Sequence, residues 1–347
     1  MKNKTKRLIS TIMAIIVVSS TIVGCNNQVK KDEKEEKTVV VDAIDREIEK
    51  PENMDKLAIT CYGGASHELS ILGGSDKILA QPDMKKFQQL LKMYPRFENV
   101  VDPGSFDNIN IEEILKVEPD MAFVGVTSKK GNKLIENSGI PTFTMLIGTA
   151  EVDSLKKEFD NVGKILGKED ISEKLINYWE DKLNMVKEAV DKVPENEKKK
   201  VYYAGETITQ ANSGKWGDSY ITGSGGINVL KDITKGAKGS EISVEQVAEF
   251  NPDVVITQKR PAGIKPIMED NRIKDLDFIK NEEVYSCPIG AFWWDRPSPE
   301  SPLGFMWLAK TLYPNYTESI DLKKEVKDFY KEFYDYELTD EEYESFF

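Results

Sequence analysis

The residues best suited to bind a ligand are aromatic, hydroxyl and cationic side chains that each follow an expected β-strand. In the first half of the chain, Tyr62, Ser66 and His67 follow the apolar run 57–61. In the second half, three further expected strands are followed by Trp216, Tyr220, Arg260, Trp293, Trp294 and Arg296. Thr127, Ser128 and Glu206 hold similar positions. Because ligands of open α/β sheets bind beyond the carboxyl ends of the strands, these side chains are expected to face one cleft.

Aromatic rings combined with two arginines suit a large, flat or anionic metal chelate. The rings would cover its organic surface, and the guanidinium groups would pair with carboxylate, catecholate or oxyanion groups. A structural role is the alternative at each position. Trp293 and Trp294 would then cap the core, one ring pointing in and the other out, and Arg296 would pair with Glu300.

The single histidine of the 347-residue chain argues against catalysis and against a cage for a bare metal ion. Zinc and manganese sites usually use two or more imidazoles, and a nucleophile triad needs a well-placed base, a role His67 would fill alone. Spacing reveals no nucleophile–base pair or metal cluster, so neither an enzyme nor a cofactor is expected. The net charge of −13 argues against binding of nucleic acid or of anionic lipid through a basic patch.

Residues 1–24 have the pattern of an export signal. Lys2, Lys4, Lys6 and Arg7 precede a mostly apolar stretch, 8–23, that is too short and too interrupted for a confident membrane span. Gly24-Cys25 resembles a bacterial lipobox, in which Cys25 becomes the diacylated N-terminus. Residues 25–37 then form a flexible tether, and the protein is expected at the cell membrane, lipid-anchored on the extracytoplasmic face.

A long helix is expected near the middle of the chain, over residues 169–194. Its apolar residues recur every three or four positions from Ile171 to Val193, and Pro194 stops it. Asp170 is expected to cap the helix with Glu173 in a capping box. At a rise of 1.5 Å per residue the helix would be roughly 34 Å long, enough to join a lobe of residues 38–168 to a lobe of residues 195–347.

An internal repeat supports this division. The segment that begins at Asn110 aligns without a gap on the segment that begins at Ser243. Each copy has an N-cap residue, a glutamate in the first turn (Glu112 or Glu245), a short helix, a Pro-Asp pair and a buried strand. The fold predicted is α/β: two Rossmann-like lobes with mainly parallel sheets, joined by one rigid helix, with a ligand cleft between them.

With these features the sequence resembles the substrate-binding lipoproteins of ABC importers, specifically the helical-backbone class. The resemblance rests on the lipobox, the doubled Glu-to-Pro-Asp segments, and the stretches 225–229, 294–300 and 307–314. It implies that Glu112 and Glu245 dock into arginine pockets of an ABC permease dimer with a cytoplasmic ATPase. Neighbouring Glu113 competes for the role of Glu112, and plain complementation of the helix dipole is the alternative for both.

The resemblance also implies the class of ligand. An iron–siderophore complex is expected first. Haem or a corrinoid is the second expectation, with His67 or a cleft tyrosine as axial ligand, and an oxyanion such as molybdate or tungstate is the third. The protein is expected to be a monomer. A surface interaction lipoprotein and an extracellular enzyme are the alternatives of other classes.

Two expectations concern packing. Cys61 and Cys287 follow strands in opposite halves, and two buried thiols are expected there rather than a disulfide. Residues 321–347 are expected to form a packed terminal helix, through Phe329 and Phe333, followed by a solvated acidic tail.

Overall fold

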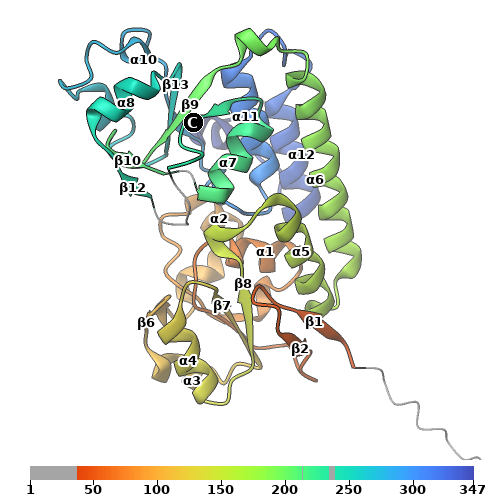
Figure 1. The fold of residues 1–347 in the computed structure, drawn as a ribbon. Coiled ribbons are helices and arrows are strands. Elements are labelled where there is room, and N and C mark those ends of the chain that lie inside the picture. Colours follow the sequence, from red (N-terminus) through yellow and green to blue (C-terminus); the bar gives the residue numbers. More distant parts are fainter. Residues whose placement is uncertain (1–36, 213, 234–238) are drawn as a thin grey trace, which may run out of the picture. The chain divides into compact units, whose positions relative to one another are not determined.

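A computed structural model describes residues 37–212, 214–233 and 239–347 (Figure 1). The predicted export signal, the lipidation of Cys25 and most of the tether lie outside the described residues. No helix in the described part of the chain is long and apolar enough to span a membrane.

The first lobe is built on a parallel sheet of four strands in the order β4-β3-β7-β8. These strands are β3 (Leu57–Ile59), β4 (Ile78–Ala80), β7 (Met121–Gly125) and β8 (Thr142–Met145). Every residue of β3, β7 and β8 is buried, as expected for parallel strands covered on both faces. The helices of this lobe are α1 (Ala65–Ile71), α2 (Gln88–Met93), α3 (Ile111–Lys116), α4 (Lys129–Asn137) and α5 (Val152–Leu166). Two antiparallel hairpins complete it: β1 (Val39–Val41) with β2 (Glu47–Glu49), and β5 (Gly104–Ser105) with β6 (Asn108–Ile109).

The second lobe contains a mixed sheet whose centre is parallel. β13 (Val254–Gln258) lies between β9 (Lys200–Ala204) and β14 (Val284–Cys287), and β11 (Ile227–Asn228) pairs with the start of β9. The short strands β10 (Gln210–Ala211) and β12 (Ser240–Glu241) extend the sheet in antiparallel pairing. The helices of this lobe are α7 (Gly214–Gly223), α8 (Val244–Phe250), α9 (Lys265–Met268), α10 (Asp277–Lys280), α11 (Ser301–Leu312), α12 (Leu322–Tyr334) and α13 (Asp340–Ser345).

Helix α6 (Glu169–Val190) runs between the lobes and packs against α5 and α11 (Figure 1). Leu175, Trp179 and Val186 on its apolar stripe are completely buried, and the Trp179 Nε1 group donates to the Pro299 carbonyl oxygen at 3.1 Å. The predicted capping box is wrong, because the N-cap is Lys168, two residues before Asp170, and no side chain caps the helix. Asp170 instead lies in the first turn, where its carboxylate complements the helix dipole.

The two copies of the internal repeat fold alike, and the predicted fold class is confirmed. α3 precedes β7, and α8 precedes β13, which are the central parallel strands of the two lobes. Asn110 caps α3 by accepting from the Glu112 amide at 3.1 Å, and Ser243 caps α8 by accepting from the Gln246 amide at 3.2 Å.

The Pro-Asp pair of each copy fixes the strand beside it. Asp120 Oδ2 accepts from the amides of Asp55 and Lys56, both at 2.9 Å, immediately before β3. Asp253 Oδ2 accepts from the amide of Lys200, the first residue of β9, at 2.7 Å. The two aspartate amides donate back to the carbonyls of Lys56 and Lys200 at 2.8 and 2.9 Å. One carboxylate therefore sets the register of two neighbouring strands in each lobe.

Replacing this carboxylate is expected to destabilise the fold. Asp253→Ala should lower the free energy of unfolding by about 1–3 kcal/mol, because the hydrogen bond from the Lys200 amide to a charged acceptor is lost. Urea denaturation followed by circular dichroism measures the change. Asp275→Ala is the matched control, since Asp275 is exposed and makes no hydrogen bond among the described residues. Equal losses in the two variants would contradict this role for Asp253.

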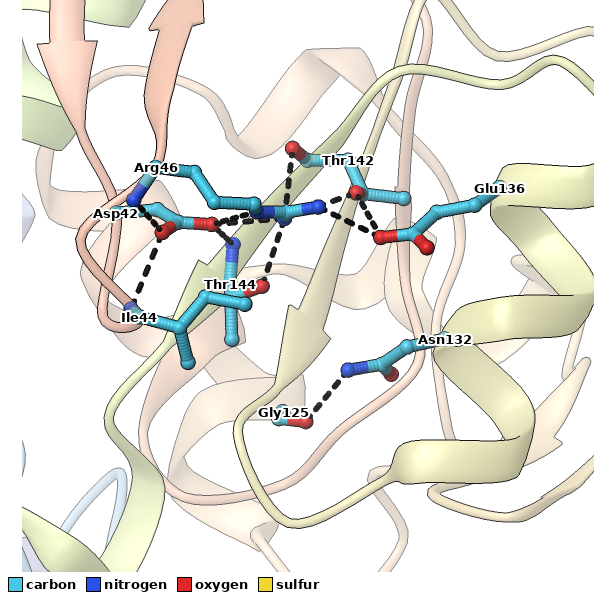
Figure 2. A network of polar contacts seen from close by, with 8 residues as sticks. All are labelled: Asp42, Ile44, Arg46, Gly125, Asn132, Glu136, Thr142 and Thr144. Atoms are coloured by element: carbon cyan, nitrogen blue, oxygen red, sulfur yellow. Dashed lines mark hydrogen bonds and ion pairs between the residues drawn. The ribbon is translucent and has the colours of Figure 1, made fainter.

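The N-terminal hairpin is fastened to the first lobe by Arg46 (Figure 2). Its guanidinium group donates to Asp42 Oδ2 at 2.7 Å, to Thr144 Oγ1 on β8 at 2.9 Å and to Glu136 Oε1 on α4 at 2.6 Å. Figure 2 also shows Asn132 of α4 donating to the carbonyl oxygen of Gly125, at 2.9 Å, where β7 ends. The hairpin, the edge strand β8 and α4 thus form one polar network.

The end of the chain corrects one prediction. The acidic stretch after α12 is not a solvated tail, because it forms α13 and buries Leu338, Tyr343 and Phe346. The Phe346 ring lies 6.0 Å from the Trp294 ring and 5.6 Å from the Tyr330 ring, between centroids. Aromatic residues spaced among the acidic residues supply this packing.

The prediction for the two cysteines is confirmed. Cys61 and Cys287 are both free and buried.

Candidate ligand-binding site

The lobes contact each other through the turns that follow β3 and β14. Gly64 has a φ of +91°, and a Cβ there would lie 2.9 Å from the carbonyl oxygen of Pro297. His67 Nε2 lies 2.5 Å from the carbonyl oxygen of Ala291. Only glycine fits the first contact, because a side chain would clash with the opposite backbone and strain its own.

A non-glycine residue with a strained backbone also lies at this end of the first lobe. Ile147 has a φ of +51°, which is rare for a β-branched residue. Its side chain occupies the space above Gly63, where a Cβ would come within 2.7 Å of it, and its 3-10 turn (Ile147–Thr149) packs against α7 of the second lobe. Such strain persists where the surrounding structure imposes it, and it concentrates at functional sites.

Three side chains form a cation–aromatic group beside these contacts. Lys86 Nζ lies 3.8 Å from the centre of the Tyr62 ring and 5.0 Å from the centre of the Trp293 ring. Tyr62 and Trp293 are half-buried, and the Tyr62 hydroxyl donates to the Asp83 carbonyl oxygen at 3.0 Å. Sequence reasoning missed Lys86, since it precedes a helix rather than directly following a strand.

Two arginines of the second lobe act on the buried carboxylate of Asp295. Arg296 Nε lies 4.0 Å from Asp295 Oδ2, and its guanidinium carbon lies 5.8 Å from the centre of the Tyr203 ring. Arg260 Nη1 pairs with Glu206 Oε1 at 2.7 Å. We call Tyr62, Lys86, Arg260, Trp293 and Arg296 the cleft cluster.

Arg296 is the cleft residue with the most unused hydrogen-bonding capacity. Its guanidinium group makes no hydrogen bond to any residue in 37–212, 214–233 or 239–347, although three-quarters of the side chain is covered. Burial raises the pKa of Asp295, and the charge of Arg296 and a hydrogen bond from Tyr203 oppose that rise. A largely covered guanidinium group with free N–H groups can donate hydrogen bonds to a bound anion.

Glu300 orders the loop that carries Trp293 and Arg296. Its carboxylate accepts from Trp294 Nε1 at 3.1 Å and from the amides of Ala291 and Phe292 at 3.3 Å. Burial raises the pKa of Glu300 to about 7, against these hydrogen bonds and one from Tyr330. The predicted alternative pairing of Arg296 with Glu300 is therefore not seen, because Glu300 is occupied by its own loop.

The other predicted ligand contacts lie in the interior. Trp294 is completely buried on Glu300 while Trp293 stays half-exposed, which confirms the predicted in–out arrangement. Trp216 Nε1 donates to the Asp295 carbonyl oxygen at 3.1 Å, and the Tyr220 hydroxyl donates to that of Gly304 at 3.2 Å. Contact of a ligand with these residues, or with Ser66 and His67, stays a prediction.

Three buried serine hydroxyls near the lobe contacts have no hydrogen-bond partner among the described residues: Ser66, Ser128 and Ser298. Ser298 lies against Gly64, and Ser128 lies beside Gly125 at the end of β7. Unpaired buried hydroxyls are costly, so these groups are available to a bound oxygen-rich ligand. No group of three His, Cys, Asp or Glu side chains in the described part of the chain is arranged to hold a metal ion.

His67 gives the fold a pH dependence of defined sign. Burial lowers the pKa of His67 to about 3, although the hydrogen bond to Ala291 acts in the opposite direction. The neutral imidazole therefore contributes stability above its unfolded pKa of about 6.5, and this is lost as the pH falls. At about pH 5 the loss should reach about 2 kcal/mol.

The measurement compares the wild type with His67→Gln in urea denaturation at about pH 7 and about pH 5. Burial raises the pKa of Glu158 to about 8 and that of Glu300 to about 7, so these carboxyl groups favour folding as the pH falls. They are common to both proteins, and the difference between the proteins isolates His67. Titration of the single imidazole near its unfolded pKa, followed by NMR in the folded wild type, would contradict this assignment.

Glu112 and Glu245 hold equivalent exposed positions. Each is the second residue of its helix, α3 or α8, and each follows an N-cap residue that hydrogen-bonds the first turn. Glu113 is half-buried and pairs with Lys116 at 2.5 Å. Among the described residues, Glu113 therefore forms a salt bridge and Glu112 does not; a docking role for either stays a prediction.

Comparison with known proteins identifies the family. The family described as "Periplasmic binding protein" matches residues 59–289. The molybdate-binding protein MolA of Haemophilus influenzae is 26% identical over 321 residues, covering 85% of this chain and 90% of that protein. The uncharacterized ABC transporter substrate-binding lipoprotein YvrC of Bacillus subtilis is 20% identical over 323 residues, covering 87% and 96%. A crystal structure of a periplasmic solute binding protein from Veillonella parvula superimposes with a TM-score of 0.75 at 26% identity, covering 89% and 96%.

This chain therefore belongs to the periplasmic binding protein family. The two lobes and the helix α6 between them confirm the predicted resemblance to the helical-backbone class of ABC-importer substrate-binding proteins.

Proposed function

We propose that the protein captures an anionic metal species outside the cytoplasm, and that a tetrahedral oxyanion of the molybdate type is its ligand. The observation that carries the proposal is the covered guanidinium group of Arg296, which has no hydrogen-bond acceptor among the described residues. Lys86 adds positive charge to the same cleft cluster, whereas Arg260 is paired with Glu206. A small dianion needs only such cations together with hydroxyl and N–H donors.

The order of ligands differs from the sequence expectation, which placed an iron–siderophore complex first. Direct contact between the lobes at Gly64 and His67 favours a small ligand over a large one. The unpaired hydroxyls of Ser66, Ser128 and Ser298 suit oxyanion oxygens. Similarity to a molybdate-binding protein over most of the chain supports the same order.

An anionic ferric chelate is the second candidate. The half-exposed rings of Tyr62 and Trp293, with Lys86 between them, favour it. Aromatic faces and an ammonium group are suited to the organic surface and the carboxylates of such a complex.

The proposal includes delivery of the ligand. Lipid on Cys25 holds the protein at the extracytoplasmic face of the membrane. Glu112 and Glu245 dock on an ABC permease dimer whose ATPase is cytoplasmic, and the protein acts as a monomer. The exposed carboxylates on two rigid helices, one in each lobe, support a two-point contact.

The test is a titration of the full-length protein with molybdate, tungstate, sulfate, a panel of ferric siderophores, haemin and cobalamin. Trp293 is half-exposed in the cleft cluster, so tryptophan fluorescence should report on ligand binding there. Isothermal calorimetry measures the affinity independently. Molybdate and tungstate are expected to bind with a Kd of about 1 μM or tighter, and sulfate more weakly. Binding of a ferric siderophore without binding of either oxyanion would select the second candidate. Failure of every ligand would overturn the proposal.

A further inference from the structure

A separate cavity lies on the flank of the lobe interface. Its volume is about 760 Å³, and it lies between α2 with the 3-10 turn after it (Pro95–Asn99) on one side and α13 with residues 289–290 on the other. This volume falls in the usual range for sites that enclose a small organic molecule. The packed rings of His67, Phe87 and Phe292, with centroids 4.6–5.2 Å apart, lie beside the cleft cluster, and Lys86 is the residue that both sites share.

The cavity is net positive in a chain of net charge −13. Its charged lining residues are Lys86, Lys92 and Lys259 against Glu98 and Glu342. Lys92 and Glu342 pair with each other, and Glu98 is exposed. Lys86 and Lys259 make no ion pair with an Asp or Glu side chain of the described residues. Both lysines therefore line the cavity without a salt bridge to an Asp or Glu side chain of the described residues. Burial lowers the pKa of Lys86, and the charge of Asp83 opposes that shift.

Lys259 and Gln89 are the two hydrogen-bond donors of the lining on which the inference rests. Lys259 Nζ donates to the main-chain oxygens of Ser345 and Phe347 at 2.8 and 2.6 Å, which fixes the ammonium group at the wall of the cavity. Burial lowers the pKa of Lys259. Gln89 is 7% exposed, and its Nε2 donor has no hydrogen-bond partner among the described residues. A buried donor without a partner is costly, and a bound acceptor would remove the cost.

The rest of the lining is apolar. Leu91, Pro95, Ile289 and Phe346 supply carbon surface between the cations. A ligand that matches this arrangement carries anionic groups at more than one end and a short carbon skeleton between them. Carboxylates suit lysines, which bind them as point charges without the planar geometry that arginine requires.

We propose that this cavity binds a small organic polycarboxylate, at a site that adjoins the proposed oxyanion site of the cleft cluster and shares Lys86 with it. The anion bridges Lys259 of the second lobe and Lys86 and Gln89 of the first. Because its walls come from both lobes, an occupied cavity holds α2 and α13 together.

The test uses the full-length protein and two tricarboxylates as probes, citrate and tricarballylate, the second of which chelates metal ions poorly. Calorimetry is expected to show binding with a Kd of about 1 mM or tighter. Lys259→Met should weaken it by about tenfold or more, whereas Lys259→Arg should keep it within about threefold. Gln89→Leu, which leaves the Lys259 contacts intact, should weaken it by about threefold or more. Lys85→Met is the matched control, because Lys85 is exposed and does not line the cavity.

Two further measurements separate this site from the cleft cluster. Molybdate affinity should stay within about twofold in Lys259→Met, and tricarboxylate affinity should stay within about twofold in Arg296→Gln. Bound tricarboxylate should protect Lys259 from acetylation by acetic anhydride, read by mass spectrometry. Absence of binding by both probes would overturn the proposal. So would binding that Arg296→Gln abolishes and Lys259→Met leaves unchanged, since the anion would then occupy the cleft cluster.

Discussion

Arg296→Gln is expected to weaken molybdate binding by about 30- to 100-fold, the largest effect of any single substitution in the cleft cluster. The Arg296 guanidinium group has no acceptor of its own among the described residues, so its hydrogen bonds become available to the ligand. Glutamine keeps two N–H donors and removes the charge. Isothermal calorimetry at constant ionic strength measures the loss.

The substitution also leaves Asp295 without its nearest cation. Asp295 is completely buried, and one of its carboxylate oxygens has no hydrogen-bond partner among the described residues. The double variant Asp295→Asn with Arg296→Gln separates lost stability from lost binding, because it removes both charges. Arg272→Gln is the control, since Arg272 is exposed and pairs with Asp270 at 2.7 Å. Unchanged affinity in a folded Arg296→Gln protein would remove Arg296 from the site.

Replacement of Glu112 and Glu245 by alanine is expected to abolish delivery while it leaves ligand binding intact. Each lost carboxylate should weaken the complex with the permease by about tenfold or more, and loss of both should weaken it by about 100-fold. Neither residue contributes to the cores of the lobes, because both side chains are exposed at helix starts. Uptake of radiolabelled molybdate by cells that express the cognate permease measures delivery, and calorimetry measures binding.

The matched control is Glu113→Ala with Gln246→Ala. These residues adjoin Glu112 and Glu245 on the same helix turns but are engaged within the protein, Glu113 with Lys116 and Gln246 with the Ser243 amide. Full uptake by the Glu112 and Glu245 double variant would show that these carboxylates only complement their helix dipoles.

The local and repeated parts of the fold could be predicted from the sequence. Apolar periodicity predicted α6, and the aligned Asn110 and Ser243 segments predicted two similar lobes, because capping residues, Pro-Asp pairs and strands act over a few positions. The N-cap of α6 was misplaced by two residues, at Asp170 in place of Lys168, since it depends on how Gly167 ends α5 in a left-handed turn (φ +67°).

The candidate site could be predicted only in part. Position after a strand was enough to select Tyr62, Arg260, Trp293 and Arg296, which lie in the cleft cluster. The same rule also selected Trp216, Tyr220 and Trp294, whose rings are buried in the core. Their hydrogen bonds go to acceptors inside the protein, such as Gly304 for Tyr220 and Glu300 for Trp294. Lys86 was missed because it does not directly follow a strand. Only the tertiary structure places its ammonium group near the Trp293 ring.

The ion pair between Lys92 and Glu342 has a consequence for the order of folding. Burial would raise the pKa of Glu342, but hydrogen bonds from Lys92, Tyr336 and Thr339 outweigh it and lower the pKa to about 2. This contact joins the first lobe to one of the last residues of the chain, so it cannot form until nearly the whole polypeptide is available. Each lobe, by contrast, sets its own strand register through Asp120 or Asp253 as soon as its segment exists. A chain that emerges N-terminus first therefore completes its first lobe early and joins the lobes last.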